Sequence, residues 1–170
     1  MAVGLRLAIV MVVAAVVSGA CGGDAKVAAL ERAIRAGDVA AVAEALTSGA
    51  SPDSTLAGAW TPLTLAASLG HTPIAAALLD AGADIERARR VGVERQWTPL
   101  GWAALGGHTD LVTLLLDRGA RVDARTSRHQ TPLMAAAAGG HRDTMARLVA
   151  AGADEDAVDA EGRRASDLVP

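Results

Sequence analysis

The chain has 170 residues, a formal net charge of −3 at pH 7 and a hydrophobic share of 51%. This acidic balance gives no overall attraction for nucleic acid or for an anionic membrane surface. A single cysteine excludes a disulfide framework, and three tryptophans without phenylalanine or tyrosine leave the core to aliphatic side chains and alanine.

The beginning of the chain has the layout of an export signal. Arg6 precedes an apolar run at 7–17, and small residues follow at 18–20. The run is short for a membrane span and is bounded as in a secretory signal. The only cysteine, Cys21, stands directly after the small residues. This arrangement resembles the bacterial lipoprotein signal, which implies removal of residues 1–20 and lipidation of Cys21.

Two other interpretations of this segment stay open. Ordinary cleavage after Ala20 would secrete the protein with Cys21 as a free thiol, and an uncleaved segment would act as a weak membrane anchor. Lipidation accounts for a lone cysteine in an exported protein. We therefore expect a lipid-anchored protein of the cell envelope, with the periplasm or secretion as alternatives. A tether at 21–25 would reach at most roughly 17 Å to the first helix near Lys26.

Three segments of the remaining chain repeat nearly the same sequence. They begin as WTPLTLAASLGHT at Trp60, WTPLGWAALGGHT at Trp97 and QTPLMAAAAGGHR at Gln130. Their Thr-Pro-Leu steps are 37 and then 33 residues apart. Repetition at this period is typical of a stacked helical array, which offers an extended surface and no deep cleft.

Each repeat contains the signals for two short helices. The threonine of Thr-Pro can cap the first helix with its hydroxyl, and proline suits the first turn, where no N–H is needed. This alanine-rich helix runs to Gly70, Gly107 or Gly140, where glycine can adopt the left-handed conformation that ends helices. The second helix carries larger apolar residues and stops at a Gly-Ala pair. One such pair of helices cannot bury its apolar face alone, so the pairs must stack.

The order TPL, GH, a leucine-rich segment and GA is similar to the ankyrin repeat. The resemblance implies an all-α solenoid of paired short antiparallel helices joined by hairpin loops. It covers residues 26–170 as one domain of about four repeats and a truncated C-terminal cap. The expected repeats are 26–58, 59–95, 96–128 and 129–161, followed by a partial repeat at 162–170.

The repeats depart from the family pattern at one position. The family's histidine after Thr-Pro-Leu is replaced by Thr64, Gly101 and Met134. The hydrogen bonds that this histidine makes between repeats in the family are therefore in question. Gly101 lies inside a short helix, where it is expected to cost about 0.5–1 kcal/mol relative to alanine. We expect modest stability.

The candidate catalytic and metal-binding side chains have structural explanations. His71, His108 and His141 hold the same position in successive repeats, about 10 Å apart if the helices pack at normal distances. Ligands of one metal ion lie about 2 Å from it, so we expect these histidines to cap turns. His129 has no cysteine or carboxylate at ligand spacing. The sequence shows no nucleophile–base–acid set and no phosphate-binding loop, and we expect neither an enzyme nor a metal or cofactor.

Arginines gather in two loops of this acidic chain. The loop between the second and third repeats has four extra residues and carries Arg87, Arg89, Arg90 and Arg95, and the next loop carries Arg125 and Arg128. In the ankyrin family, these loops and the first helices bind proteins. Arginine favours interfaces because its planar fork pairs with carboxylates. A contact surface and an ordinary solvated loop both remain open.

The three tryptophans lie beside the same loops. Trp60 and Trp97 precede the Thr-Pro steps, and Trp102 falls in the first helix of the third repeat. Tryptophan is a frequent anchor in protein interfaces, which favours a contact role. The alternative is that these side chains fill space under the loops.

The sequence thus predicts an exported, lipid-anchored ankyrin-type monomer that binds a protein partner at the bacterial envelope. The predicted contact residues are the three tryptophans and the six arginines of the two loops. The alternative within the binding class is a dedicated helper or inhibitor of one envelope enzyme or toxin. Nucleic acid is not an expected partner, because the basic residues are confined to two loops.

Overall fold

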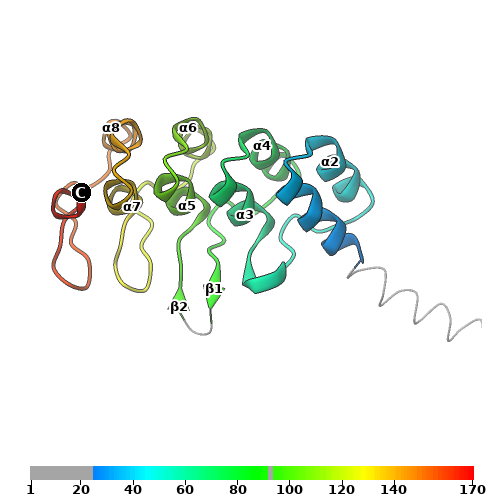
Figure 1. The fold of residues 1–170 in the computed structure, drawn as a ribbon, viewed down its shortest axis with the longest axis horizontal. Coiled ribbons are helices and arrows are strands. Elements are labelled where there is room, and N and C mark those ends of the chain that lie inside the picture. The colour runs from blue at the N-terminus through cyan, green and yellow to red at the C-terminus, as the bar shows by residue number, and fades with distance from the viewer. Residues whose placement is uncertain (1–24, 92–93) are drawn as a thin grey trace, which may run out of the picture.

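The computed structural model of the chain describes residues 25–91 and 94–170, and the predicted signal segment with Cys21 lies outside the described residues. In the described part, antiparallel pairs of helices stack side by side into an elongated solenoid (Figure 1). The expected helical solenoid is confirmed. Among the described helices, none is long and apolar enough to cross a membrane.

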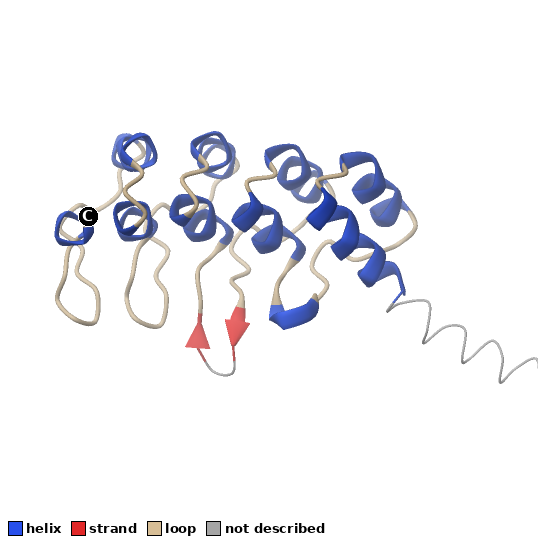
Figure 2. Ribbon diagram, in the orientation of Figure 1, coloured by secondary structure: helices blue, strands red, loops and turns tan. Residues whose placement is uncertain are grey.

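Two rows of helices make up the array, as Figure 2 shows. The inner row begins with a helix described over residues 25–36 and continues with α3 (Pro62–Leu69), α5 (Pro99–Leu105) and α7 (Pro132–Ala138). The outer row contains α2 (Val39–Thr47), α4 (Thr72–Asp80), α6 (Thr109–Asp117) and α8 (Arg142–Ala150). Helix α5 packs between α3 and α7, while α4 and α6 pack between their outer neighbours.

Four loops, here called fingers, project from one side of the inner row (Figure 1). They comprise residues 51–60, 84–97, 121–130 and 154–164. The first finger contains a short 3₁₀ helix, η1 (Ala57–Ala59), and the second contains the strands β1 (Arg90–Val91) and β2 (Glu94–Arg95). The strands pair antiparallel, with Arg90 opposite Arg95 and Val91 opposite Glu94. This two-stranded hairpin is added to the otherwise helical plan and accommodates the extra residues of the second finger. After the fourth finger, η2 (Ala165–Leu168) packs against α7.

The predicted signals at the helix ends are confirmed. The side chains of Thr61, Thr98 and Thr131 accept hydrogen bonds from the backbone N–H groups three residues later, and a proline opens each inner helix. The glycines expected to end these helices have positive φ values of 74°, 68° and 70° at Gly70, Gly107 and Gly140. Local chemistry therefore fixes where the helices of these repeats begin and end.

The residues that replace the expected histidine, such as Thr64 and Met134, have different structural roles. In α3, the Thr64 hydroxyl accepts a hydrogen bond from the backbone N–H of Thr61 at 2.9 Å and donates to its carbonyl at 3.0 Å. In α7, Met134 is 1% exposed and joins the core. Thr64 thus tightens the start of its own helix, and Met134 contributes apolar packing between repeats.

Small side chains allow the inner helices to approach one another. Ala66, Ala103 and Ala136 are completely buried on α3, α5 and α7. The largest fully buried side chains of the described residues come equally from the inner helices, as with Leu63 and Leu100, and from the outer helices, as with Leu78 and Leu111. Alanine adds little side-chain entropy cost on burial, so closely packed alanines suit a stack with few aromatic residues.

The histidines between the rows do not act as the expected turn caps. His71, His108 and His141 precede the outer helices, but none of their side chains makes a capping hydrogen bond. Their rings lie over glycines of the preceding repeat instead. A Cβ atom at Gly70 would come within 2.6 Å of His108 Nδ1, and His141 Nε2 donates to the Leu105 carbonyl at 3.1 Å. The capping prediction was therefore wrong, because these rings serve the contact between repeats.

Carboxylates connect each finger to the next. The Asp53 carboxylate accepts the backbone N–H of Asp84 at 3.0 Å, and the Asp123 carboxylate accepts that of Asp154 at 3.1 Å. Asp84 and Asp154 in turn accept backbone N–H groups two residues later. Asp84 and Asp154 thus stabilise their own turns, while Asp53 and Asp123 connect neighbouring repeats.

Asp159 organises the fourth finger. Its fully enclosed carboxylate accepts from Arg163 Nε and Nη2 at 2.9 and 2.7 Å and from the backbone N–H groups of Glu161 and Arg163. The hydrogen bond from the Arg163 side chain is the main cause that lowers the pKa of Asp159 to about 2, against the opposing effect of burial. The charged carboxylate is therefore favoured in the folded state.

We predict that replacing Asp159 by asparagine lowers the free energy of unfolding near neutral pH. Because the folded pKa lies below the ordinary value of 3.8, this stabilisation is complete above about pH 4 and is lost as the pH falls towards about 2. Urea unfolding followed by circular dichroism should show the difference between wild type and Asp159→Asn narrowing over that interval. The control is Asp156→Asn, whose carboxylate is 88% exposed; an equal effect of both variants would contradict the assignment.

Candidate interaction surface

Three predicted contact residues meet in one cluster. The ring centroids of Trp60 and Trp102 lie 4.8 Å apart with the planes tilted by 48°. The guanidinium carbon of Arg89 lies 4.4 Å from the centroid of the Trp60 ring. Trp60 is the last residue of the first finger, Arg89 belongs to the second finger, and Trp102 lies on α5. We call these three residues the aromatic–cation cluster.

The first finger holds the side chain of Arg89 in place. Its turn closes when the backbone N–H of Leu56 donates to the Trp60 carbonyl at 2.8 Å. Within the turn, Gly58 has φ 69°, a conformation that most side chains disfavour. The Gly58 carbonyl then accepts a hydrogen bond from Arg89 Nε at 3.0 Å. The guanidinium is thus held over Trp60 by a hydrogen bond and a cation–π contact.

Trp97 occupies the space that a side chain at position 101 would need. A Cβ atom at Gly101 would lie 2.7 Å from Cε3 and 3.0 Å from Cβ of Trp97. Gly101 is buried and lies in α5. The expectation that Gly101 merely weakens its helix relative to alanine was therefore wrong, because the missing Cβ makes room for the indole.

All three tryptophans are half-buried. Each packs against the core, and each retains partial exposure to solvent. The indole Nε1 of Trp102 is enclosed and makes no hydrogen bond among the described residues. Filling space and offering a contact face are thus compatible roles here.

The predicted arginines divide into paired and unpaired groups. Arg128 reaches Glu161 of the fourth finger at 3.4 Å. Arg87 and Arg125 are exposed and have no ion-pair partner within the described part of the chain. Arg90 and Arg95 are partners in the backbone register of the hairpin. The sequence thus located the basic fingers but did not separate the neutralised arginines from the available ones.

Other residues that shape the surface were missed from the sequence. Gly58 sets the turn under Arg89, and Glu86 neutralises Arg121 of the third finger at 3.1 Å. Trp97 precedes Thr98, the N-cap of α5, and therefore lies outside the helix, so helical spacing did not predict its contact with Gly101. Contacts between different repeats have no local sequence signal from which they could be predicted.

The histidine rings and acidic turns do not assemble into a metal centre. Over residues 25–91 and 94–170, no group of three His, Cys, Asp or Glu side chains could hold a metal ion. The histidines lie in successive repeats, each against a glycine of the preceding repeat. Their arrangement serves the stacking of repeats.

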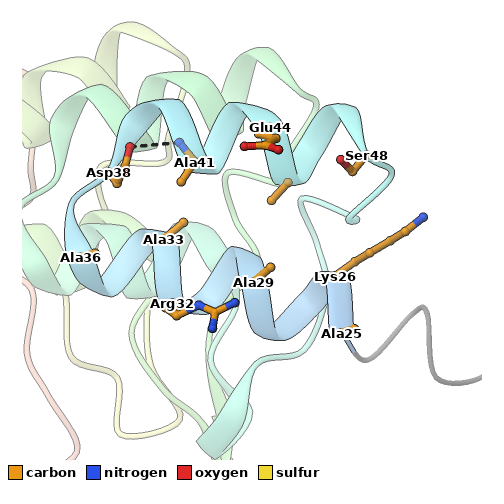
Figure 3. A pocket seen from close by; sticks show the side chains of 11 residues that line it. Ala25, Lys26, Ala29, Arg32, Ala33, Ala36, Asp38, Ala41, Glu44 and Ser48 are labelled. Atoms are coloured by element: carbon orange, nitrogen blue, oxygen red, sulfur yellow. Dashed lines mark hydrogen bonds between the residues drawn. The ribbon is translucent and has the colours of Figure 1, made fainter.

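A separate groove lies at the N-terminal end of the array (Figure 3). It has a volume of about 560 Å³ and runs between the 25–36 helix and α2. Its floor is formed by alanines such as Ala29, Ala33 and Ala41, and its rim carries charges of both signs, including those of Arg32 and Glu44. This groove is distant in sequence from the aromatic–cation cluster and shows no preference for one charge.

Comparison with known proteins identifies the repeats. The family model for ankyrin repeats in three copies matches residues 30–126 and 88–159. A segment of 53 residues is 51% identical to a horse (Equus caballus) protein named ankyrin repeat, SAM and basic leucine zipper domain-containing protein 1. The match covers 31% of this chain and 11% of that protein. The similarity therefore involves about a third of this chain and a small part of that relative.

We predict that Gly101→Ala lowers the free energy of unfolding by about 1–3 kcal/mol, the usual cost of overpacking. Helix propensity alone predicts the opposite sign, a gain of about 0.5–1 kcal/mol. The measurement is urea unfolding of the wild type, Gly101→Ala, Trp97→Ala and the double variant. Without the indole, Gly101→Ala should become neutral or stabilising. A stabilising effect in the presence of Trp97 would contradict the steric explanation.

Proposed function

This chain belongs to the ankyrin repeat family, and on that premise we propose that it binds a protein partner through the aromatic–cation cluster and the adjoining fingers. The proposed contact residues are Trp60, Trp97, Trp102, Arg87, Arg89, Arg90, Arg95, Arg125 and Arg128. The row of fingers offers an extended surface, as repeat arrays do.

The observation that carries this proposal is the stacking of Arg89 on Trp60 beside Trp102. Tryptophan and arginine are the residues most enriched among energetic hot spots of protein interfaces. Here they are held in place before any partner arrives, so little side-chain entropy remains to be lost on binding. Because the chain has no tyrosine or phenylalanine, gathering its tryptophans at the fingers concentrates its aromatic surface there.

We further propose that the protein is exported and tethered by a lipid on Cys21. The support is the sequence pattern of the first 21 residues, together with the described helix that begins by residue 25. The tether would be so short that the solenoid lies against the membrane. A membrane-bound partner would then meet the fingers at a raised effective concentration.

We predict that the double variant Arg89→Glu with Arg90→Glu reduces capture of the partner from envelope extracts at least roughly ten-fold. Charge reversal removes the cation from Trp60 and opposes an interface that the arginines favour. Quantitative mass spectrometry of the captured proteins measures the effect, and circular dichroism checks the fold. The matched control reverses Arg32 and Arg142, which are exposed on helices away from the fingers. Capture that is equal in both double variants would remove this surface assignment.

We predict that mass spectrometry of the amino terminus of the mature protein finds Cys21 as the first residue, carrying acyl chains. Cys21→Ser should move the protein from the membrane fraction to the soluble fraction, since a lipid anchor contributes membrane affinity with each buried CH₂ group. An unmodified thiol at Cys21 or an intact residue 1–20 segment would refute the lipid anchor. Neither result would affect the assignment of the binding surface.

A further inference from the structure

We propose that the segment bound by the fingers is acidic, an extended peptide that carries carboxylates beside apolar side chains. This inference rests on the proposed protein-binding function and specifies the chemistry of its partner. It follows from the way in which the fingers use their own charges.

Four carboxylates of the first three fingers whose side chains the structure describes are committed to internal bonds. Asp53 and Asp123 accept backbone N–H groups of the next finger, and Asp84 accepts one in its own turn. Glu86 accepts from both the backbone N–H and the side chain of Arg121, at 2.8 and 3.1 Å. These negative charges hold the fingers together and are therefore poorly placed to neutralise other arginines.

The arginines around the cluster keep unused donors. Arg87 and Arg125 are exposed and make no ion pair with any described residue. Arg89 uses Nε for the Gly58 carbonyl, while its two terminal amino groups have no hydrogen-bond acceptor in the described structure. These two groups form the end of the guanidinium fork, which can bind a carboxylate with two parallel hydrogen bonds while the plane stays on Trp60.

The arrangement also sets the form of the partner. Neighbouring repeats stack about 10 Å apart. Two carboxylates of the peptide that pair with cations of the second and third fingers would therefore lie at a similar distance from each other. An extended chain advances about 3.3 Å per residue, which places acidic residues about three positions apart. Apolar side chains between them would meet the exposed faces of the tryptophans.

A nucleic acid is less well matched than a peptide. Its phosphates could pair with the arginines, and its bases could stack on tryptophan. Its charge is continuous, however, and a strand that follows the fingers would pass exposed carboxylates of the fourth finger such as Asp156 and Glu161. A short acidic peptide needs to contact only the second and third fingers.

Tryptophan fluorescence gives a direct test of the local charge. Because the tryptophans account for all of the Phe, Trp and Tyr content, quenching by iodide and by caesium compares anion and cation access to this surface. We predict that the ratio of iodide to caesium quenching constants, divided by the same ratio for free N-acetyltryptophanamide, exceeds one despite the acidic chain. This ratio of iodide to caesium quenching should fall in Arg125→Gln and in Arg89→Gln. It should stay unchanged in Arg118→Gln, whose side chain pairs with Asp80 on the outer row. A ratio at or below one would overturn the proposal.

The same fluorescence should report binding of a peptide of about twelve residues that has glutamate at every third position and leucine between. We expect binding to weaken roughly ten-fold, or about 1.4 kcal/mol, in the double variant Arg89→Gln with Arg125→Gln. Arg125 is exposed and makes no ion pair with any described residue, so Arg125→Gln alone should show part of the loss in a folded protein. The comparison probes are the lysine–leucine peptide and an oligothymidylate of equal length.

The outcomes separate this inference from the proposed function. Tighter binding of the lysine peptide or of the oligothymidylate, or no binding of the glutamate peptide, would refute the acidic partner. If capture of the envelope partner still depends on Arg89 and Arg90, the binding surface itself would survive that result. Peptide binding without any effect of Arg89→Glu and Arg90→Glu on capture would instead refute the surface as the site of the cellular partner.

Discussion

The close approach of neighbouring inner helices is the constraint on which the structure depends. Completely buried alanines on α3, α5 and α7 permit it, and the histidine rings fill the space over the glycines of the preceding repeat. A larger side chain at these positions would increase the distance between repeats. The same spacing brings each finger within reach of the next, so that an aspartate can bond to a backbone N–H about thirty positions later. Packing in the helical rows therefore sets the geometry of the loops.

The aromatic–cation cluster is a product of this spacing. Its residues come from the first finger, the second finger and α5, and no single helix pair contains all three. The cluster can form only when the second and third repeats are stacked, since each repeat buries its apolar face only against its neighbours. The proposed binding surface and the stability of the array thus depend on the same interfaces between repeats. Gly101 illustrates the connection, because the missing Cβ serves both the packing of α5 and the placement of Trp97.

The sequence predicted those features that depend on residues close together in the chain. Thr-Pro at the helix starts, glycine at the helix ends and the repeat spacing all express local chemistry, and the helices follow them. The tryptophans and arginines of the fingers were also found from the sequence, but their partners were not. Whether Arg128 meets Glu161, or a histidine lies over a glycine, depends on the distance between repeats. That distance is set by tertiary packing. The repeat pattern predicts that the repeats stack but does not give the distance between them.

Selective pairing of charges explains how an acidic protein can present a basic surface. The net charge of −3 acts at long range and is screened beyond about 8 Å at physiological ionic strength. At shorter range, an acidic segment meets the free ends of Arg87, Arg89 and Arg125, whose neighbouring carboxylates are occupied by backbone N–H groups and by Arg121. Moderate salt would therefore reduce the unfavourable long-range repulsion more than the direct contacts. Recognition in this proposal depends on which arginines the fold leaves unpaired. The stacking of the fingers determines that set, and the amino-acid composition alone does not predict it.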